Sequence, residues 1–167
     1  MALFLCRSLL FAGAGLEASA EYRTDNDFLL SGSALFSRSY RYGEASAFFT
    51  FGGRTYGRKE FVLNENREYD QLKEHRLFGI LGFDATLMPT SRAGLYGKAG
   101  FGYSGGFYRG TSRTPPERVT PVVGAGVQVS SPKEDNMTFS ARLGYVYKDM
   151  CTDSPHGITL SFRIQAF

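Results

Sequence analysis

The chain has 167 residues, of which 43% are hydrophobic and 21% are charged, and its net charge is +3. That length suits one domain, and the composition excludes a disordered or fibrous chain. The 19 basic and 16 acidic residues nearly balance, so the charge gives no reason to expect a nucleic-acid partner. No apolar run approaches the ~18–20 residues of a spanning helix. The 20 Gly, 15 Phe and 10 Tyr residues, with no Trp, are typical of many short strands.

The N-terminal stretch has two interpretations. Ala18-Ser19-Ala20 before Glu21 resembles a signal-peptidase site, but no basic segment begins the chain and Arg7 interrupts the apolar part. Within 11–23, however, the even positions are apolar and the odd positions are small or charged. Because side chains alternate between the two faces of a strand, we expect 11–23 to be a strand.

The same alternation recurs along the rest of the chain. Expected strands cover 11–23, 28–42, 46–57, 76–88, 95–108, 119–130, 137–148 and 157–166. The pattern is least regular in 28–42, where Leu35 and Arg38 break the apolar parity. A β-bulge in that strand would explain both residues.

The connections between these strands are of two kinds. Three are short turns rich in Gly, Pro, Ser and Asn, at 43–45, 89–94 and 131–136. The others, at 24–27, 58–75, 109–118 and 149–156, are mostly longer and more charged, and the second could hold one helical turn around Tyr69–Leu72. Short and long connections alternate, which predicts an all-β, eight-stranded, antiparallel up-and-down barrel.

The two faces of the strands favour a membrane barrel over a soluble, lipocalin-like one. The polar face consists mainly of Gly, Ser and Thr with isolated charges, whereas a wall that meets water normally carries many Lys, Glu and Asp. The apolar face carries Leu, Val, Ala and Phe at mid-strand and Tyr near the ends, as expected where a wall meets lipid. We therefore predict a transmembrane barrel with short periplasmic turns and longer outer loops.

At this point the chain resembles the eight-stranded outer-membrane barrels of the OmpA transmembrane-domain, OmpX and OmpW type. The resemblance spans about residues 9–167, and its local matches are TPVVGAGV at 120–127, ARLGY at 141–145 and the closing strand that ends at Phe167. Because such barrels have even strand numbers, cleavage after Ala20 would leave seven strands. We therefore expect 11–167 to be one barrel domain, and 1–10 a periplasmic segment or a signal remnant.

The resemblance also implies a location and a set of roles. It implies a bacterial outer-membrane protein that is not an enzyme, acts through its surface loops in adhesion, partner binding or envelope integrity, and needs no cofactor. The alternative is a narrow channel for small hydrophobic molecules, and the third possibility is a lipid A-modifying enzyme. Outer-membrane lipid is the expected partner, and the expected state is a monomer.

Charged residues on the predicted inner face should pair with one another, because a buried charge is costly alone. The expected lumen network comprises Glu17, Glu21, Asp84, Lys98, Arg142 and Arg163. Counting residues back from the turns places Asp84 opposite Lys98, and Gly126 opposite Arg142. Closure of the barrel brings Glu17 near Arg163. The network could line a selective pore, but a plugged polar core is the simpler prediction.

Two groups of loop residues could carry further chemistry. Arg109, Arg113 and Arg118 make loop 109–118 basic, so it could bind anionic glycolipid or host surface molecules. Asp153, Ser154 and His156 lie close together and could form a catalytic triad, although three polar residues around a proline are also an ordinary surface turn.

Other motifs give no site. Residues 100–105 spell GxGxxG but lie within an expected strand, so the motif lacks the context of a dinucleotide site. Cys6 and Cys151 fit no metal spacing. They are expected at opposite ends of the barrel, too far apart for a disulfide bond, so we expect neither a metal site nor a Cys6–Cys151 bond.

Overall fold

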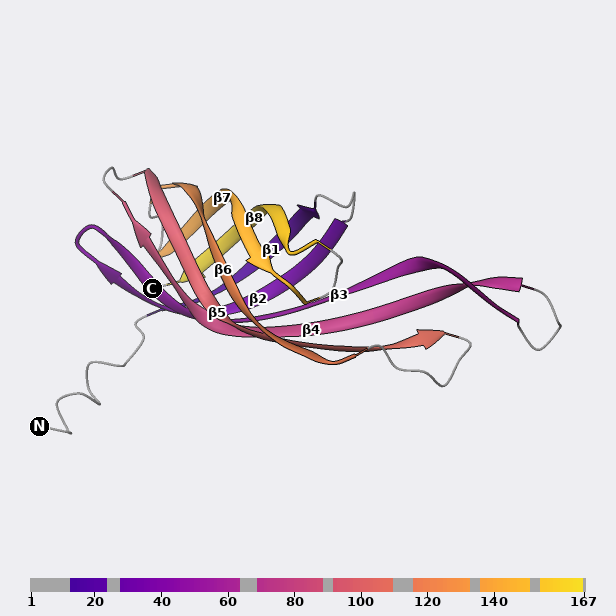
Figure 1. Cartoon of the computed structure of the whole chain (residues 1–167). Coiled ribbons are helices and arrows are strands. Elements are labelled where there is room, and N and C mark those ends of the chain that lie inside the picture. The colour runs from indigo at the N-terminus through magenta and orange to yellow at the C-terminus, as the bar shows by residue number, and fades with distance from the viewer. Residues whose placement is uncertain are drawn as a thin grey trace, which may run out of the picture.

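Eight antiparallel strands close into one barrel in the computed structural model of the chain (Figure 1). They are β1 (Gly13–Arg23), β2 (Phe28–Tyr40), β3 (Gly43–Leu63), β4 (Tyr69–Leu87), β5 (Ala93–Arg109), β6 (Arg118–Ser130), β7 (Met137–Lys148) and β8 (His156–Ala166). Each strand pairs with its neighbour in sequence, and β1 pairs with β8. The predicted fold class is confirmed.

The structure describes residues 13–23, 28–63, 69–88, 92–109, 116–132, 136–150 and 154–166. Side chains are described for these residues except in 55–63, 69–73 and 108–109. Asp153, which could have belonged to a catalytic triad, the closing residue Phe167 and both cysteines lie outside the described residues. In the described ranges, no helix is long and apolar enough to cross a membrane.

The alternation of the sequence separates an apolar outer face from a polar inner face. Outward side chains such as Leu16, Leu81, Phe101 and Phe162 remain 61–69% exposed, since they have no protein partner outside the barrel. Buried inward side chains are mostly charged or polar, and Arg163 is 1% exposed. Large apolar side chains around the whole outer wall and charges inside it are the arrangement of a barrel that spans a membrane.

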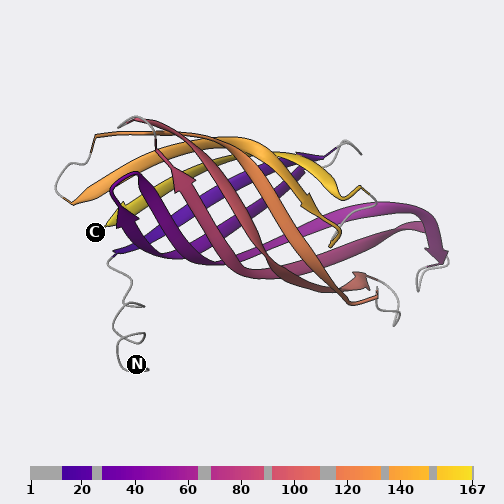
Figure 2. The ribbon, with the colours of Figure 1, turned by 60° about the vertical axis from the view of Figure 1, so that its left-hand side comes forward.

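The strands tilt strongly across the barrel wall (Figure 2). The end of β8 lies at the same end of the barrel as the β2–β3 turn. That turn consists of Arg41 and Tyr42, because Tyr40 pairs directly with Gly43. The expected turn at 43–45 is therefore wrong by two residues, and β3 begins where the turn was expected to begin.

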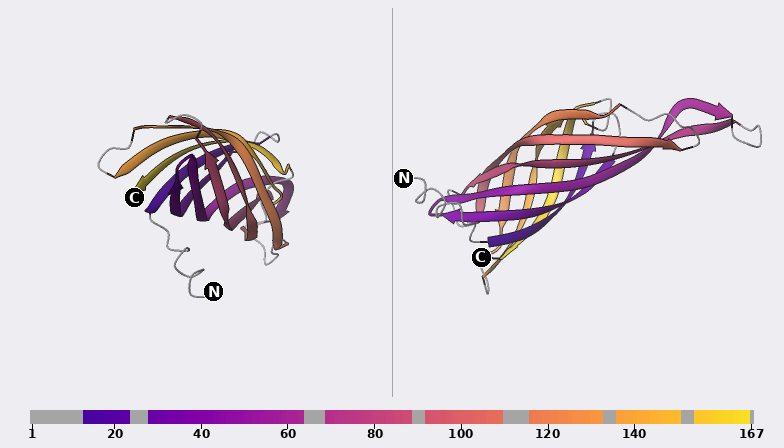
Figure 3. Two further views of the ribbon diagram at one scale, coloured as in Figure 1. Left: turned by 90° about the vertical axis from the view of Figure 1, so that its left-hand side faces the viewer. Right: turned by 90° about the horizontal axis from the view of Figure 1, so that it is seen from below.

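The largest departure from expectation concerns 58–75, which was expected to be a loop. The β3–β4 ladder continues through that segment from Gly43–Leu87 to Leu63–Tyr69, with a register shift between Gly57 and Phe61. Residues 56–63 of β3 and 69–73 of β4 therefore form a ribbon that projects beyond the other strands (Figure 3). We call this ribbon the β3–β4 arm. The helical turn expected at Tyr69–Leu72 is wrong because these residues belong to β4. Outside the barrel both faces of a ribbon can meet water. Charged residues can therefore stand on either face, and the apolar–polar alternation that identifies a wall strand is absent from 58–75.

The bulge expected in β2 is also wrong. The ladders of β2 with β1 and with β3 run without a register shift. Leu35 points inward and is 1% exposed. It belongs to an apolar cluster inside the barrel that comprises Leu29, Leu35, Phe48, Phe78, Ile80, Val122, Val146 and Met150. Arg38 faces outward near the turn and lies over the ring of Tyr40 at 5.9 Å.

The register of β6 with β7 differs by two residues from the expected one. Arg142 lies opposite Gln128, and Gly126 lies opposite Gly144. The expected count assumed that the strands pair up to their turn, but β6 and β7 pair only as far as Ser130–Ser140. The first residues of β7, from Met137, pair with β8 instead. A shift of two preserves the faces, so Arg142 still points inward.

Candidate functional site

A network of four ionised side chains from four strands occupies the barrel interior. Arg163 Nε donates to Glu17 Oε2 at 2.8 Å, and Arg142 Nη1 donates to Asp84 Oδ2 at 3.1 Å. Arg163 also forms an ion pair with Asp84, and Arg142 lies 3.5 Å from Glu17. All four residues are at most 9% exposed. Each charge therefore has opposite charges beside it, as buried ions require.

Polar side chains satisfy the remaining hydrogen bonds of this network. Arg142 donates to Gln128 Oε1 and, at 2.8 Å, to Thr86 Oγ1. Its guanidinium carbon lies 4.6 Å from the centre of the Tyr96 ring. That ring fits against Gly126 and Gly144, where any Cβ would collide with it. Gly126 thus makes room for Tyr96, not for Arg142 as its expected register suggested.

A second charged cluster lies nearer the end opposite the short turns. Glu21 forms 2.7 Å ion pairs with both Arg23 and Lys148. Arg23 also donates to the backbone carbonyls of Lys148, at 3.1 Å, and Ser154. The Arg23 side chain is fully buried. It therefore ties the end of β1 to both ends of the β7–β8 connection.

The β7–β8 connection also turns into the barrel. Met150 is 0% exposed, and its carbonyl accepts hydrogen bonds from Ser104 Oγ at 2.6 Å and Arg76 Nη1 at 3.3 Å. Arg76 in turn forms an ion pair with the fully buried Glu74. Met150 belongs to the interior apolar cluster. Among the described residues, the β7–β8 connection therefore packs into the half of the lumen that lies away from the short turns.

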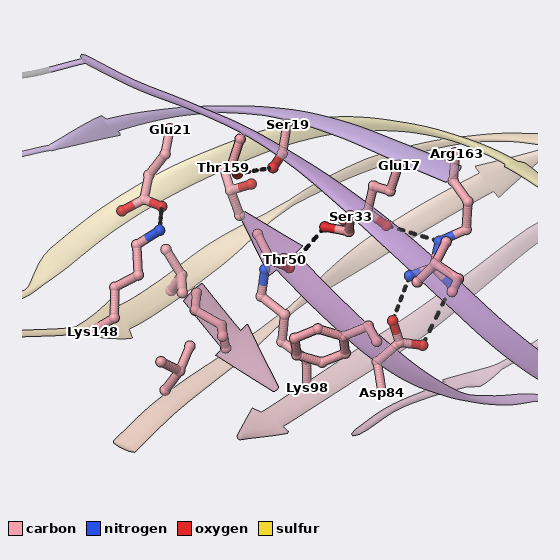
Figure 4. Close-up of a pocket in the computed structure, with 16 residues that line it drawn as sticks. Glu17, Ser19, Glu21, Ser33, Thr50, Asp84, Lys98, Lys148, Thr159 and Arg163 are labelled. Atoms are coloured by element: carbon pink, nitrogen blue, oxygen red, sulfur yellow. Dashed lines mark hydrogen bonds and ion pairs between the residues drawn. The ribbon is translucent and has the colours of Figure 1, made fainter. Parts of the chain in front are cut away.

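Between the two charged clusters lies a cavity of about 20 Å³ (Figure 4). That volume admits about one water molecule. Lys98 lines the cavity, and its side chain runs beside Thr50 and away from the Asp84 carboxylate. Lys98 lies opposite Asp84 in the β4–β5 ladder, as predicted. The expected Asp84–Lys98 pair nevertheless does not form, because Arg142 and Arg163 occupy the carboxylate.

The three loop arginines are not brought together by described contacts. Arg118 begins β6 and forms a 2.9 Å ion pair with Asp149, with both side chains more than 40% exposed. Arg109 is the last residue of β5, and its side chain is not described. Arg113 lies outside the described residues. The basic loop therefore stays a prediction from the sequence.

The histidines do not form a catalytic triad in the described part of the chain. His156 contacts Tyr145 through its Nδ1 and lies 5.5 Å from the Tyr147 ring, on the outer wall. Ser154 contributes its backbone carbonyl to Arg23. His75 stacks on the outward-facing Phe107 at 4.9 Å. The described His, Cys, Asp and Glu residues form no group of three that could hold a metal ion.

The sequence reasoning missed several interior ions. Arg23 and Lys148 share the inward parity of Glu21 and Arg142, so the alternation alone could have identified them. Glu74 and Arg76 were missed because they were assigned to a loop or to its edge. Glu44, which contacts Arg163 and Gln165, was missed because it was assigned to a turn.

Comparison with known proteins shows similarity in fold. No protein-family model matches the sequence, and no curated protein matches it either. The structure is similar to that of Ail, the attachment invasion locus protein of Yersinia pestis, with a TM-score of 0.56, 14% identity, and coverage of 92% of this chain and 94% of that chain. Ail in complex with the heparin analogue sucrose octasulfate gives a TM-score of 0.55 at 14% identity and the same coverage. Neisserial surface protein A gives 0.52 at 11% identity, covering 92% of this chain and 94% of that chain.

Proposed function

We propose that this bacterial outer-membrane barrel acts at the cell surface, where its β3–β4 arm and the neighbouring loops bind a partner or an anionic surface molecule. The arm carries this proposal. β3 has 21 residues and β4 has 19, whereas β1 and β8 have 11 each. The extra length projects past the other strands (Figure 1) and adds nothing to the wall. A surface role explains why a chain maintains it.

The filled interior argues against the alternative of a channel for small hydrophobic molecules. Among the described residues, the ion pairs around Asp84 occupy the half of the lumen near the short turns, and the Glu21 ion pairs and Met150 with its apolar neighbours lie in the other half. The wall has an apolar groove of about 490 Å³ over Ala18, Ala20 and Gly32. The linings of this groove and of the interior cavity share Ser19 and Ser31. The β1–β2 ladder, continuous from Gly13 to Tyr22, and the 2.7 Å hydrogen bond between these two serines run between the groove and the lumen.

The ligand class follows from charge. Loop 109–118 carries Arg109, Arg113 and Arg118 against Glu117, which favours a polyanion. The structurally similar Ail has been solved with a heparin analogue. We therefore assign sulfated glycans or anionic glycolipids as the first ligands to test.

The experiment displays the chain on cells that otherwise do not adhere and measures their retention on heparin-coated beads. One variant replaces 56–73 with a two-residue turn, and a second carries R109Q, R113Q and R118Q. Retention of cells with the parent chain, and loss of retention with either variant at equal surface expression, would support the proposal. Arg38→Gln at the opposite end is the matched charge control. Equal retention of all variants and of cells without the protein would contradict it.

A further inference from the structure

The outer wall carries an apolar groove at the end of the barrel where the short turns lie. It spans β6, β7 and β8, and its volume is about 630 Å³, within the range of small-molecule sites. Its apolar lining comprises Val129, Phe139, Ala141, Phe162 and Ile164. The four larger side chains are 44–61% exposed, so apolar surface faces the membrane around the groove.

The strand register explains why a groove forms there. Ala141 of β7 pairs with Val129 of β6 on one side and with Phe162 of β8 on the other. Phe139 and Ile164 pair in the next outward-facing row. A single methyl group therefore lies among four large side chains, and Ala141 forms the floor of the groove.

Among the residues that the structure describes, the charges on the outside of this end of the barrel are positive. Arg92 lines the edge of the groove next to Ser131 and Pro132. Elsewhere on the same rim, Arg38 and Arg41 lie over the rings of Tyr40 and Tyr42 at 5.9 and 5.1 Å. The carboxylates that the structure describes near this end, Glu44 and Asp84, turn inward to Arg163. A molecule in the groove therefore meets apolar surface along its length and a cation at its end.

We propose that the groove binds one anionic glycerophospholipid of the periplasmic leaflet, with an acyl chain over Ala141 and the phosphate beside Arg92. Apolar walls with a basic residue at the interface match an acyl chain and its headgroup. A second copy of the chain fits less well. A two-fold pair through this face would bring the same apolar patch of both copies together and would add no anion at the cationic edge of the groove.

The test measures lipid retention on the full chain refolded in a neutral detergent. Native mass spectrometry compares phosphatidylglycerol with phosphatidylcholine. One phosphatidylglycerol should remain bound per barrel. Arg92→Gln should reduce its retention about fivefold, as expected for one basic residue at an anionic lipid surface. Ala141→Phe should reduce the retention of both lipids about tenfold, which corresponds to excluding about two methylene groups from the groove.

Two matched control variants distinguish binding of lipid in this groove from general association of lipid with the barrel. Arg41→Gln removes a cation from the same rim, and Gly32→Leu fills the other wall groove, where an added Cβ would meet nothing within 4 Å. Neither should change retention. Ala141→Met repeats the filling test with a flexible side chain in case the Phe variant folds poorly. Equal retention of the two lipids, equal losses in Arg92→Gln and Arg41→Gln, or a dimer that Ala141→Phe dissociates would each overturn the proposal.

Discussion

Asp84 joins the two arginines of the interior ion network. Its carboxylate forms ion pairs with both Arg142 and Arg163. Lys98 lies directly opposite it in the ladder but takes no part in these pairs. Removing the carboxylate would leave two buried guanidinium groups with fewer partners, whereas removing the Lys98 amine leaves the network intact.

We predict that Asp84→Ala lowers the free energy of unfolding by about 3–5 kcal/mol, the usual cost of breaking a buried ion pair. Lys98→Ala should cost clearly less, because its amine has no ion pair among the described residues. The measurement is urea unfolding of the barrel in micelles. In a double-mutant cycle, Asp84 should couple to Arg163 and not to Lys98. Coupling to Lys98 instead would show that the lysine, and not the arginines, neutralises the carboxylate.

Gly144 provides a second test at the same scale. A Cβ on Gly144 would collide with the Tyr96 hydroxyl and lie 2.6 Å from the Ala125 carbonyl. Gly144→Ala should therefore destabilise the barrel by about 1–3 kcal/mol, as overpacking does. Tyr96→Phe should recover part of that loss. Gly32→Ala is the control, since its methyl group meets open space, and a comparable loss there would point to a general effect of replacing glycine.

These residues show what alternation can and cannot predict. Parity alone predicted that Glu17, Asp84, Arg142 and Arg163 face inward. Counting from the turn predicted that Asp84 lies opposite Lys98, and closure of the barrel predicted that Glu17 lies near Arg163. The alternation did not predict which charged side chains form ion pairs, because long side chains reach across the lumen. Arg142 and Asp84 contact each other from β7 and β4, strands that are not neighbours in the wall.

At the scale of elements, the bounds of the strands were predicted well in the barrel wall, where one face meets lipid. They were predicted poorly in the β3–β4 arm, where neither face of the ribbon meets lipid. The bounds of β7 matched the sequence prediction, whereas β3 and β4 continue far beyond theirs. In the wall, the bilayer enforces a period of two. In the arm both faces can carry charge, so a ribbon and a loop have similar sequences, and only the backbone pairing distinguishes them.

The topology of these elements is testable by labelling. With Cys6 and Cys151 replaced by Ser, a single cysteine in 64–68, between β3 and β4 in the sequence, should react with a membrane-impermeant maleimide on intact cells. A cysteine in 133–135 should react only after the envelope is opened, because we expect the short turns to face the periplasm. The opposite pattern would mean that the barrel is inserted the other way round.

At the scale of the whole molecule, closure depends on the seam between the first and last strands. β1 pairs with β8 from Ala14–Ala166 to Arg23–Gly157, and the Glu17–Arg163 ion pair crosses this seam. A chain that starts at Glu21 would keep only the end of β1. Two unpaired strand edges would then face lipid, where unsatisfied backbone groups are costly.

We therefore predict that deleting residues 1–20 abolishes folding of the barrel, while deleting residues 1–10 leaves it intact. Circular dichroism and protease resistance in micelles would distinguish the two outcomes. A stable, protease-resistant barrel from the shorter chain would show that β1 is dispensable and that the seam can close in another way.

The arm has a mechanical consequence. β3 and β4 continue from the arm into the wall with one register shift, between Gly57 and Phe61, and in the wall β3 pairs with β2 up to Gly53 and β4 with β5 up to Lys73. A pull on the tip is therefore directed along strands whose hydrogen bonds lie across the direction of force. Such a ladder resists as a set of bonds loaded together, whereas a flexible tether would only straighten. A ligand held at the tip would transmit tension straight into the barrel wall, and the cell would be anchored by the shear strength of two ladders.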